Sequence, residues 1–199
     1  MRILIVKLSS IGDIIHAMPA VAAVRRAVPE AELSWVVEAR SAEILRGAWM
    51  EDADRPLVDH LIEIDTRSIR AKSVEKILPE ISRQAKSIRK QKYDIAIDLQ
   101  GLIKSGAIAK FSGAKSRWGF SKKDLRESAS RFFLTDTVKI EPKTHIIRKN
   151  LRLATEALSI RFDDSLIEFP IGTTDEHRAE ANAMIEQAGE RFAILNPAG

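Results

Sequence analysis

The sequence predicts a doubly wound α/β fold with a Rossmann-like parallel sheet. The first observation is a nearly continuous apolar run from Ile3 to Val6, which is typical of a strand buried on both faces. The second is the alternation of such runs with helical segments, which requires right-handed crossovers and helices on both faces of the sheet. The third is a cluster of small residues, Ser9, Ser10 and Gly12, directly after the first run. Small residues there allow a sharp bend and the close approach of a ligand.

The segments between the apolar runs carry helical signals. Pro19 suits the first position of a helix that runs to about Ala27, because its missing N–H would be unpaired there anyway. Helical sequence also lies around Ser41–Ala48, and Pro79 suits the start of a helix with an apolar stripe. The strands predicted after the first one are Glu32–Val37, Val58–Ile64, Tyr93–Leu99, Ser116–Phe120 and Thr137–Ile140.

The C-terminal part of the sequence predicts the start of a second α/β unit. Thr144 is predicted to cap one helix, and the capping-box spacing of Thr173 and Glu176 predicts another that runs to Gly189. A last apolar run then leads into the small-residue loop Asn196-Pro-Ala-Gly199. A new strand and loop after an acidic helix are typical of a domain that is beginning. We therefore expect one domain over residues 1–170 and the incomplete start of a second over residues 171–199.

The composition favours a cytoplasmic protein with its own core. Apolar residues make up 45% of the chain, and cysteine is absent, so a disulfide-stapled secreted domain and a thiolate zinc site are both excluded. The N-terminal apolar run is too short for a signal peptide, and no run of about 18 apolar residues is present for a membrane span. We expect a cytoplasmic protein that is at most peripheral to a membrane.

The positive charge is concentrated in the first part of the chain. Of 32 Lys and Arg and 28 Asp and Glu, residues 151–199 hold 4 and 9, which leaves 28 and 19 for residues 1–150. Between Ile64 and Arg131 there are 17 basic and 7 acidic residues. Such a surplus attracts a polyanion or an anionic membrane surface, although solvated helix faces account for part of it.

Asp13 directly follows the turn after the first strand, at the sheet edge where open α/β folds bind ligands. The pattern alone allows either a functional carboxylate or a simple helix cap. The stretch Lys7-Leu-Ser-Ser-Ile-Gly-Asp13, followed by Pro19, resembles the N-terminal motif of the bacterial ADP-heptose:lipopolysaccharide heptosyltransferases of glycosyltransferase family 9, above all heptosyltransferase I. Asp98-Leu-Gln-Gly-Leu-Ile-Lys-Ser105 resembles a second motif of that family.

The resemblance implies an inverting, metal-independent glycosyltransferase of the two-domain GT-B class that uses no cofactor. Its donor would be ADP-L-glycero-D-manno-heptose and its acceptor the Kdo inner core of lipopolysaccharide, on Kdo-lipid A. Asp13 corresponds to the proposed base, which takes the proton of the acceptor hydroxyl. The resemblance also implies a monomer without a nucleic-acid partner, in peripheral contact with the cytoplasmic face of the anionic inner membrane. The 199 residues alone would be inactive, because most of the donor-binding domain lies outside them.

The other expected site residues fall into two groups. An acceptor with carboxylates and phosphates requires Arg and Lys on the ligand-side loops, and Arg suits bidentate pairing. The resemblance assigns acceptor binding to the turn after the first strand, to the loop after the third strand, and to one arginine farther on. It matches the final loop to the phosphate-binding loop of the donor domain. The expected residues are Ser10, Gly12, Arg67, Arg70, Lys72 and Arg126 for the acceptor, and Ala198 and Gly199 for the donor phosphates.

Three other functions are weighed against this one. Asp52-Ala-Asp54 has the Asp-x-Asp spacing of metal-dependent glycosyltransferases, but an exposed turn explains it better, and no metal site is expected. A non-catalytic Rossmann-like module that binds nucleic acid or an anionic membrane would explain the charge but not the Ser9–Asp13 turn. A dinucleotide-dependent oxidoreductase is disfavoured because the first turn lacks Gly-x-Gly-x-x-Gly.

Overall fold

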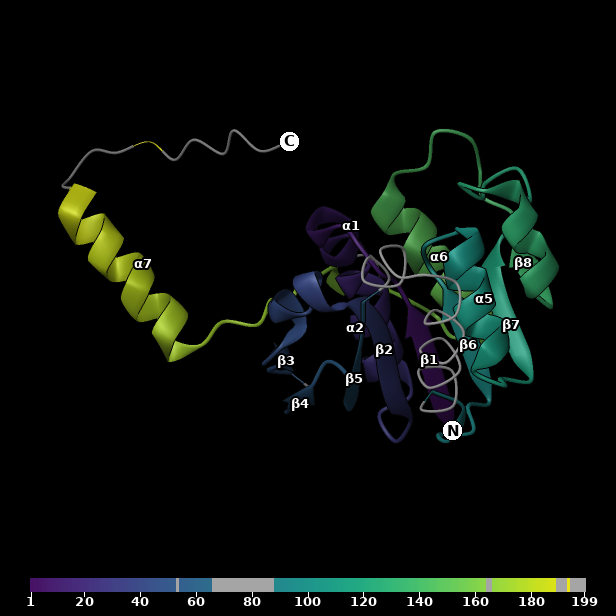
Figure 1. The fold of residues 1–199 in the computed structure, drawn as a ribbon, viewed down its shortest axis with the longest axis horizontal. Helices are drawn as coiled ribbons and strands as arrows, with labels where there is room; N and C mark the ends of the chain where they lie inside the picture. Colours follow the sequence, from purple (N-terminus) through teal and green to yellow (C-terminus); the bar gives the residue numbers. More distant parts are fainter. Residues whose placement is uncertain (53, 66–87, 164–165, 189–192, 194–199) are drawn as a thin grey trace, which may run out of the picture.

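The computed structural model describes residues 1–52, 54–65, 88–163, 166–188 and 193, and these form an α/β domain followed by one further helix (Figure 1). Six parallel strands make one sheet in the order β5-β2-β1-β6-β7-β8. The predicted doubly wound Rossmann-like fold is thereby confirmed. The strands are β1 (Arg2–Val6), β2 (Glu32–Glu38), β5 (His60–Ile64), β6 (Ile95–Asp98), β7 (Ser116–Phe120) and β8 (Asp136–Val138).

Helices cover both faces of this sheet. α2 (Met18–Ala27) and α6 (Ile146–Leu158) pack against each other on one face, while α5 (Ile103–Phe111) and the 3-10 segment η3 (Ser128–Phe133) pack against each other. A short helix, α1 (Ile11–Ile15), follows β1 directly. α1 and the amino terminus lie at opposite ends of β1 (Figure 1).

The side chains of β1 divide between two apolar clusters. Ile3 and Ile5 pack with α2 and α6, whereas Leu4 and Val6 join the cluster that contains Ala109 of α5. All four β1 side chains have no exposed surface, which is worth about 1.5–3 kcal/mol each in apolar burial. β1 is therefore covered on both faces, as the apolar run predicts.

Two predicted features between β2 and β5 differ from the structure. The helix expected at Ser41–Ala48 is replaced by two 3-10 turns, η1 (Ala39–Ser41) and η2 (Glu43–Leu45), after which Gly47 has a φ of 72°. After it, β3 (Trp49–Met50) and β4 (Arg55–Pro56) form a small antiparallel sheet that the sequence did not predict.

Both predicted caps are displaced by one residue. The Thr144 hydroxyl donates to the Glu141 carbonyl oxygen, so the side chain of His145 accepts from the backbone of α6 instead. At α7 (Asp175–Ala188), Thr174 and His177 exchange the two capping bonds that were expected at Thr173 and Glu176. The helix predicted at Pro79 and the last predicted strand lie outside the described residues.

The segment between α6 and α7 is held to the domain at Gly172. Its N–H donates to the carbonyl oxygen of Ile44 over 3.1 Å, and a Cβ at this position would lie 1.8 Å from the Arg46 carbonyl oxygen. Only glycine allows the two backbones to approach this closely. No residue of α7 is buried, and α7 stands apart from the sheet in Figure 1.

A buried ion pair joins α2 to the sheet. The fully buried guanidinium of Arg25 donates to Asp59 over 2.7 Å and to the carbonyl oxygen of Ala31 over 2.9 Å, and the Leu33 N–H also donates to Asp59. Burial, the largest influence, raises the pKa of Asp59, but the bonds from Arg25 and Leu33 outweigh it and the net pKa is lowered.

We predict that Asp59→Asn destabilises the protein by at least about 2 kcal/mol, because it leaves the buried Arg25 charge without its counter-ion. A lowered carboxyl pKa stabilises the fold above the unfolded value of about 4, and that contribution is lost as the pH falls through the folded pKa. Urea denaturation at pH 7 and at a series of pH values below 4 measures both effects. The control, Glu156→Gln, removes the exposed Arg152–Glu156 pair and should cost below about 0.5 kcal/mol. Equal losses in the two variants would contradict the role assigned to Asp59.

Candidate functional site

The candidate site lies where the central parallel strands end. Val6 of β1 is in register with Val36 of β2 and with Asp98 of β6, so the residues that follow these positions meet at one edge of the sheet. Lys7 follows β1 directly, and α1 begins four residues later. The faces of the doubly covered sheet are mostly apolar, so charged and polar groups gather at this carboxyl edge.

Asp13 lies in α1 instead of in the loop that the sequence predicts. The turn of α1 is closed by backbone bonds, including Ile14 N–H to the carbonyl oxygen of Ser10 at 3.0 Å. Ser10 is the N-cap residue of α1 and its side chain makes no capping bond, whereas the backbone of Ser10 bonds to the Asp13 carboxylate. The carboxylate, 17% exposed, also has side-chain partners. A contact with the first turn of α1 and a role in the site are therefore compatible for Asp13.

Arg126 is the nearest partner of the Asp13 carboxylate. Its Nη2 donates to Oδ1 of Asp13 over 2.8 Å, although the two residues lie 113 positions apart in the chain. Arg126 belongs to the loop after β7, and its side chain is half exposed. The structure thus brings together two residues that the sequence assigned to the site separately.

The second sequence motif forms a tight turn at the end of β6. Oδ1 of the fully buried Asp98 accepts from the N–H groups of Gln100 and Gly101, and its Oδ2 accepts from the hydroxyl of Ser105. The side chain of Gln100 returns to the first motif, where its Oε1 accepts from the N–H of Leu8 over 3.1 Å. The two motifs are therefore bonded to one another.

The same turn docks the loop that carries Arg126. The N–H of Glu127 donates to the Gly101 carbonyl oxygen over 3.0 Å, and a carboxylate oxygen of Glu127 accepts from the N–H of Ile103 over 2.6 Å. Gly101 has a φ of 72°, and a Cβ there would come within 3.3 Å of the Leu125 side chain and 3.4 Å of the Arg126 nitrogen. The Asp98 turn therefore holds Arg126 above Asp13.

Lys7 provides a second cation beside Asp13. Its ammonium donates to the carbonyl oxygen of Leu99 over 2.9 Å and lies 4.0 Å from Oδ1 of Asp13. The side chain is only 1% exposed. Asp13 thus has one buried cation and one half-exposed cation as neighbours.

These neighbours set the protonation of the site. Burial is the largest single influence on the pKa of Asp13, and it raises that pKa. The opposite effects, from the Arg126 hydrogen bond, the charges of Lys7 and Arg126 and a backbone bond at Ser10, are larger in sum, so the net pKa is lowered. Burial lowers the pKa of Lys7 to about 8, against the raising effect of Asp13 and Asp98. Burial also raises the pKa of Asp98 to about 6, despite its hydrogen bonds. Near pH 7, Asp13 is a carboxylate that can accept a proton.

The remaining predicted site residues have different outcomes. Ser10 is exposed beside Asp13, and a Cβ at Gly12 would meet no atom within 4 Å, so the space next to this turn is open. The rest lie outside the described residues: Arg67, Arg70, Lys72, Ala198 and Gly199.

The structure gives no support to a metal site at Asp52. Its carboxylate accepts from Nε of Arg26 over 2.5 Å, and Asp54 lies in the turn between β3 and β4 with a φ of 46°. Within the described ranges, no group of three His, Asp or Glu side chains is close enough to hold a metal ion. In the same ranges, no helix has the length and apolar character needed to cross a bilayer.

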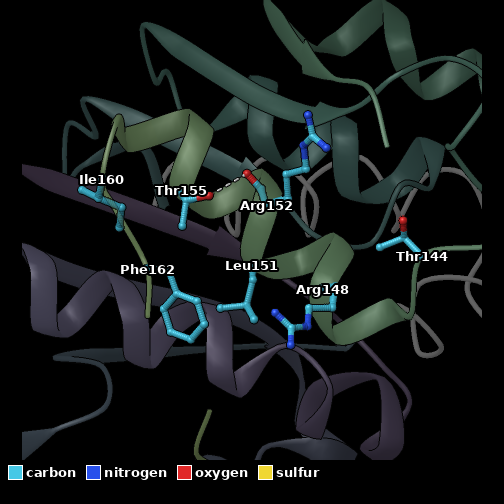
Figure 2. A pocket seen from close by; sticks show the side chains of 7 residues that line it. All are labelled: Thr144, Arg148, Leu151, Arg152, Thr155, Ile160 and Phe162. Atoms are coloured by element: carbon cyan, nitrogen blue, oxygen red, sulfur yellow. Dashed lines mark hydrogen bonds between the residues drawn. The ribbon is translucent and has the colours of Figure 1, made fainter. Parts of the chain in front are cut away.

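Two hollows lie away from Asp13. One, of about 430 Å³, is formed along α6 (Figure 2); Leu151 and Phe162 lie together in it, while Arg152 points away from them and pairs with Glu156. The other, of about 370 Å³, lies at the amino ends of β6 and β7, at the sheet edge opposite Asp13. The first is lined by Thr144, Arg148, Leu151, Arg152, Thr155, Ile160 and Phe162, and the second by Arg89, Lys92, Tyr93, Asp94, Ser112, Gly113 and Lys115.

Sequence reasoning missed two members of the Asp13 group. Lys7 was part of the quoted motif but was given no role, although a lysine directly after a strand buried on both faces is itself a signal. Glu127, which docks the Arg126 loop, carries no signal in the sequence, because only the fold brings it to Ile103.

Comparison with known proteins finds relatives that match most of this chain. Lipopolysaccharide heptosyltransferase 1 of Pseudomonas aeruginosa PAO1 is 30% identical over 183 residues, which cover 92% of this chain and 49% of the relative. The enzyme of the same name from Escherichia coli K12 is 30% identical over 159 residues, covering 79% of this chain and 48% of the relative. The chain therefore spans about half the length of the curated relatives it matches.

A solved structure shows the same arrangement of the chain. The structure of E. coli heptosyltransferase WaaC with ADP-2-deoxy-2-fluoro heptose superposes with a TM-score of 0.74 at 27% identity, and the match covers 85% of this chain and 52% of that one. Such coverage fits one half of a two-domain GT-B enzyme. The sequence model described as glycosyltransferase family 9 (heptosyltransferase) matches residues 81–198, more than half of the chain. The chain belongs to glycosyltransferase family 9, the heptosyltransferase family.

Proposed function

We propose that this chain is the acceptor-binding half of an inverting heptosyltransferase, which moves heptose from ADP-L-glycero-D-manno-heptose to the Kdo inner core of lipopolysaccharide. The observation that carries the proposal is the Asp13 carboxylate at the carboxyl edge of the sheet, with Arg126 bonded to it. The names of the heptosyltransferase 1 relatives and the ADP-heptose analogue bound to WaaC support the donor and the reaction class.

In the proposed reaction, Asp13 acts as the general base. The acceptor hydroxyl oxygen forms a bond to the anomeric carbon of heptose, and the bond from that carbon to the ADP oxygen breaks on the opposite side, which inverts the configuration. The hydroxyl proton passes to the Asp13 carboxylate, and ADP leaves with the bonding electron pair. A positioned base of this kind contributes roughly 10² to 10⁴-fold to the rate.

Arg126 gives acceptor binding a direct effect on this base. Kdo carries a carboxylate, which competes with Asp13 for the Arg126 guanidinium. Once the acceptor binds Arg126, Oδ1 of Asp13 is released to meet the acceptor hydroxyl. Arg126 thus occupies the Asp13 carboxylate until an acidic acceptor binds. This pairing disfavours transfer of heptose to water.

The other proposed assignments extend this arrangement. Ser10 and Gly12 leave room for the acceptor beside Asp13, and Arg67, Arg70 and Lys72 supply further cations for its carboxylates and phosphates. Residues 1–170 form the acceptor domain, and residues 171–199 begin the donor domain with Ala198 and Gly199 in its phosphate loop. The surplus positive charge of residues 1–150 supports peripheral contact with an anionic inner membrane.

We predict that Asp13→Asn lowers kcat at least about a hundredfold in the complete enzyme, because asparagine keeps the size of the side chain but cannot take the proton. The lowered carboxyl pKa of the free chain places the acid limb of the kcat/KM profile below the ordinary aspartate range, and the acid limb should vanish in the variant. The measurement is kcat and kcat/KM against pH, with thermal melting as the control for folding. Retention of more than roughly a tenth of wild-type kcat would rule out Asp13 as the base.

A second prediction concerns Arg126. Arg126→Met should raise the acceptor KM by about tenfold or more with little change in the donor KM, because the variant loses a charge-assisted contact. It should also increase hydrolysis of the sugar nucleotide in the absence of acceptor, because Asp13 is uncovered. Lys123→Met, which removes an exposed charge from the same loop, is the matched control. A parallel rise in both KM values, or the same effect in the control, would contradict an acceptor role.

The domain assignment gives a third prediction. Residues 1–199 alone should bind ADP only weakly, because most of the proposed donor domain is missing from them. Isothermal titration with ADP, compared with a Kdo disaccharide, measures this. Micromolar binding of ADP by these residues would place the donor site in the first half and overturn the assignment.

A further inference from the structure

We infer that Lys7 is the positioning residue of Asp13: a buried ammonium that fixes the carboxylate at the site and remains beside it when Arg126 is drawn away. No role for Lys7 follows from the proposed reaction itself, in which it touches neither substrate. The inference deepens the proposed function and rests on it for the catalytic part, whereas the coupling between Lys7 and Asp13 is a property of the chain.

Hydrogen bonds hold both the backbone and the side-chain ammonium of Lys7. Its backbone N–H donates to the Val36 carbonyl oxygen over 3.3 Å, and its own carbonyl oxygen accepts from the indole N–H of the fully buried Trp35 over 3.0 Å. Its ammonium is bonded to the carbonyl oxygen of Leu99, beyond the end of β6. The backbone of Lys7 is therefore tied to β2, while its ammonium is held by the carbonyl oxygen that follows β6.

A lysine with 1% exposure is costly unless negative groups compensate its charge. Leu99 supplies only a carbonyl dipole, and the carboxylates that raise the pKa of Lys7 are Asp13 and Asp98. Asp98 already accepts three hydrogen bonds from its own turn. Asp13 is the carboxylate that Lys7 faces at 4.0 Å, and it is the more exposed member of the pair.

The two cations beside Asp13 differ in how readily a ligand can draw them away from the carboxylate. Arg126 lies on a loop and is half exposed, so an acidic acceptor can engage it. Lys7 lies below the site and is shielded from any ligand. When the acceptor carboxylate and the donor diphosphate enter, they add negative charge around Asp13 and favour its protonation. Lys7 opposes this effect and keeps the base ready to receive a proton.

The groups that act on the titration of Asp13 come from four places. Lys7 lies at the end of β1 and Arg126 on the loop after β7. Ser10, whose backbone bonds to Asp13, lies directly before α1. Asp98 at the end of β6 acts through its effect on Lys7. Lys104 of α5 lies at the same sheet edge but pairs with Glu38 over 3.3 Å, so it offers a matched lysine that is not paired with Asp13.

The test is a direct NMR titration of the Asp13 carboxyl carbon in residues 1–199, assigned by comparison with Asp13→Asn. In Lys7→Met, which keeps length and apolar character but removes the charge, the titration midpoint of Asp13 should rise. In Lys104→Met it should stay at the wild-type value. Equal midpoints in wild type and Lys7→Met would overturn the inference.

A reciprocal measurement decides the matter if Lys7→Met does not fold. Coupling between two sites is mutual, so Asp13→Asn should lower the titration midpoint of the Lys7 ammonium below its wild-type value of about 8. The measurement follows the Lys7 side-chain resonances against pH. An unchanged Lys7 midpoint would mean that the two groups do not act on each other.

Kinetics in the complete enzyme distinguish this inference from the proposed function. Lys7→Met should move the acid limb of the kcat profile to higher pH, so the variant should lose more kcat at pH 4 than at pH 8, and the donor KM should stay unchanged. A purely structural lysine would give the same loss at both pH values. If wild type transfers no heptose, the proposed function fails, while the two titrations still report on Lys7 and Asp13.

Discussion

The central position of β1 is the constraint on which the site depends. The strand is paired on both edges, with β2 and β6, and its side chains are buried on both faces, so its polar continuation emerges only at the carboxyl end. There Lys7 bonds to the backbone of both neighbours, and α1 follows at once. The Lys7 and Asp13 side of the site is therefore built directly on a central strand that is paired on both edges and buried on both faces.

The two motifs recognised in the sequence act as one structural unit. The turn at Asp98 contributes hydrogen bonds inside the protein: to its own backbone, to Ser105 and, through Gln100, to Leu8. Through Gly101 and Ile103 it also holds the Arg126 loop next to α1. The two motif carboxylates thus differ: Asp98 is fully buried and bonds only within the protein, whereas Asp13 is partly exposed beside Arg126.

Much of this could be predicted from the sequence, because periodicity reports burial. The apolar runs gave every strand of the large sheet to within a few residues, and the position of Asp13 followed from topology. The ion pair of Arg126 with Asp13 could not be predicted, since it joins residues 113 positions apart through a loop whose docking depends on Glu127. The 3-10 turns at Ala39–Leu45 were mistaken for a helix because short apolar segments satisfy both patterns.

The docking of the Arg126 loop has a consequence for substitutions at position 126. The loop is held by the N–H and the carboxylate of Glu127 and by the backbone of Gly101 and Ile103, none of which involves the side chain at position 126. That side chain can be exchanged without releasing the loop. A single substitution at position 126 therefore changes the charge beside Asp13, and with it the pKa of that carboxyl, while the surrounding backbone keeps its place.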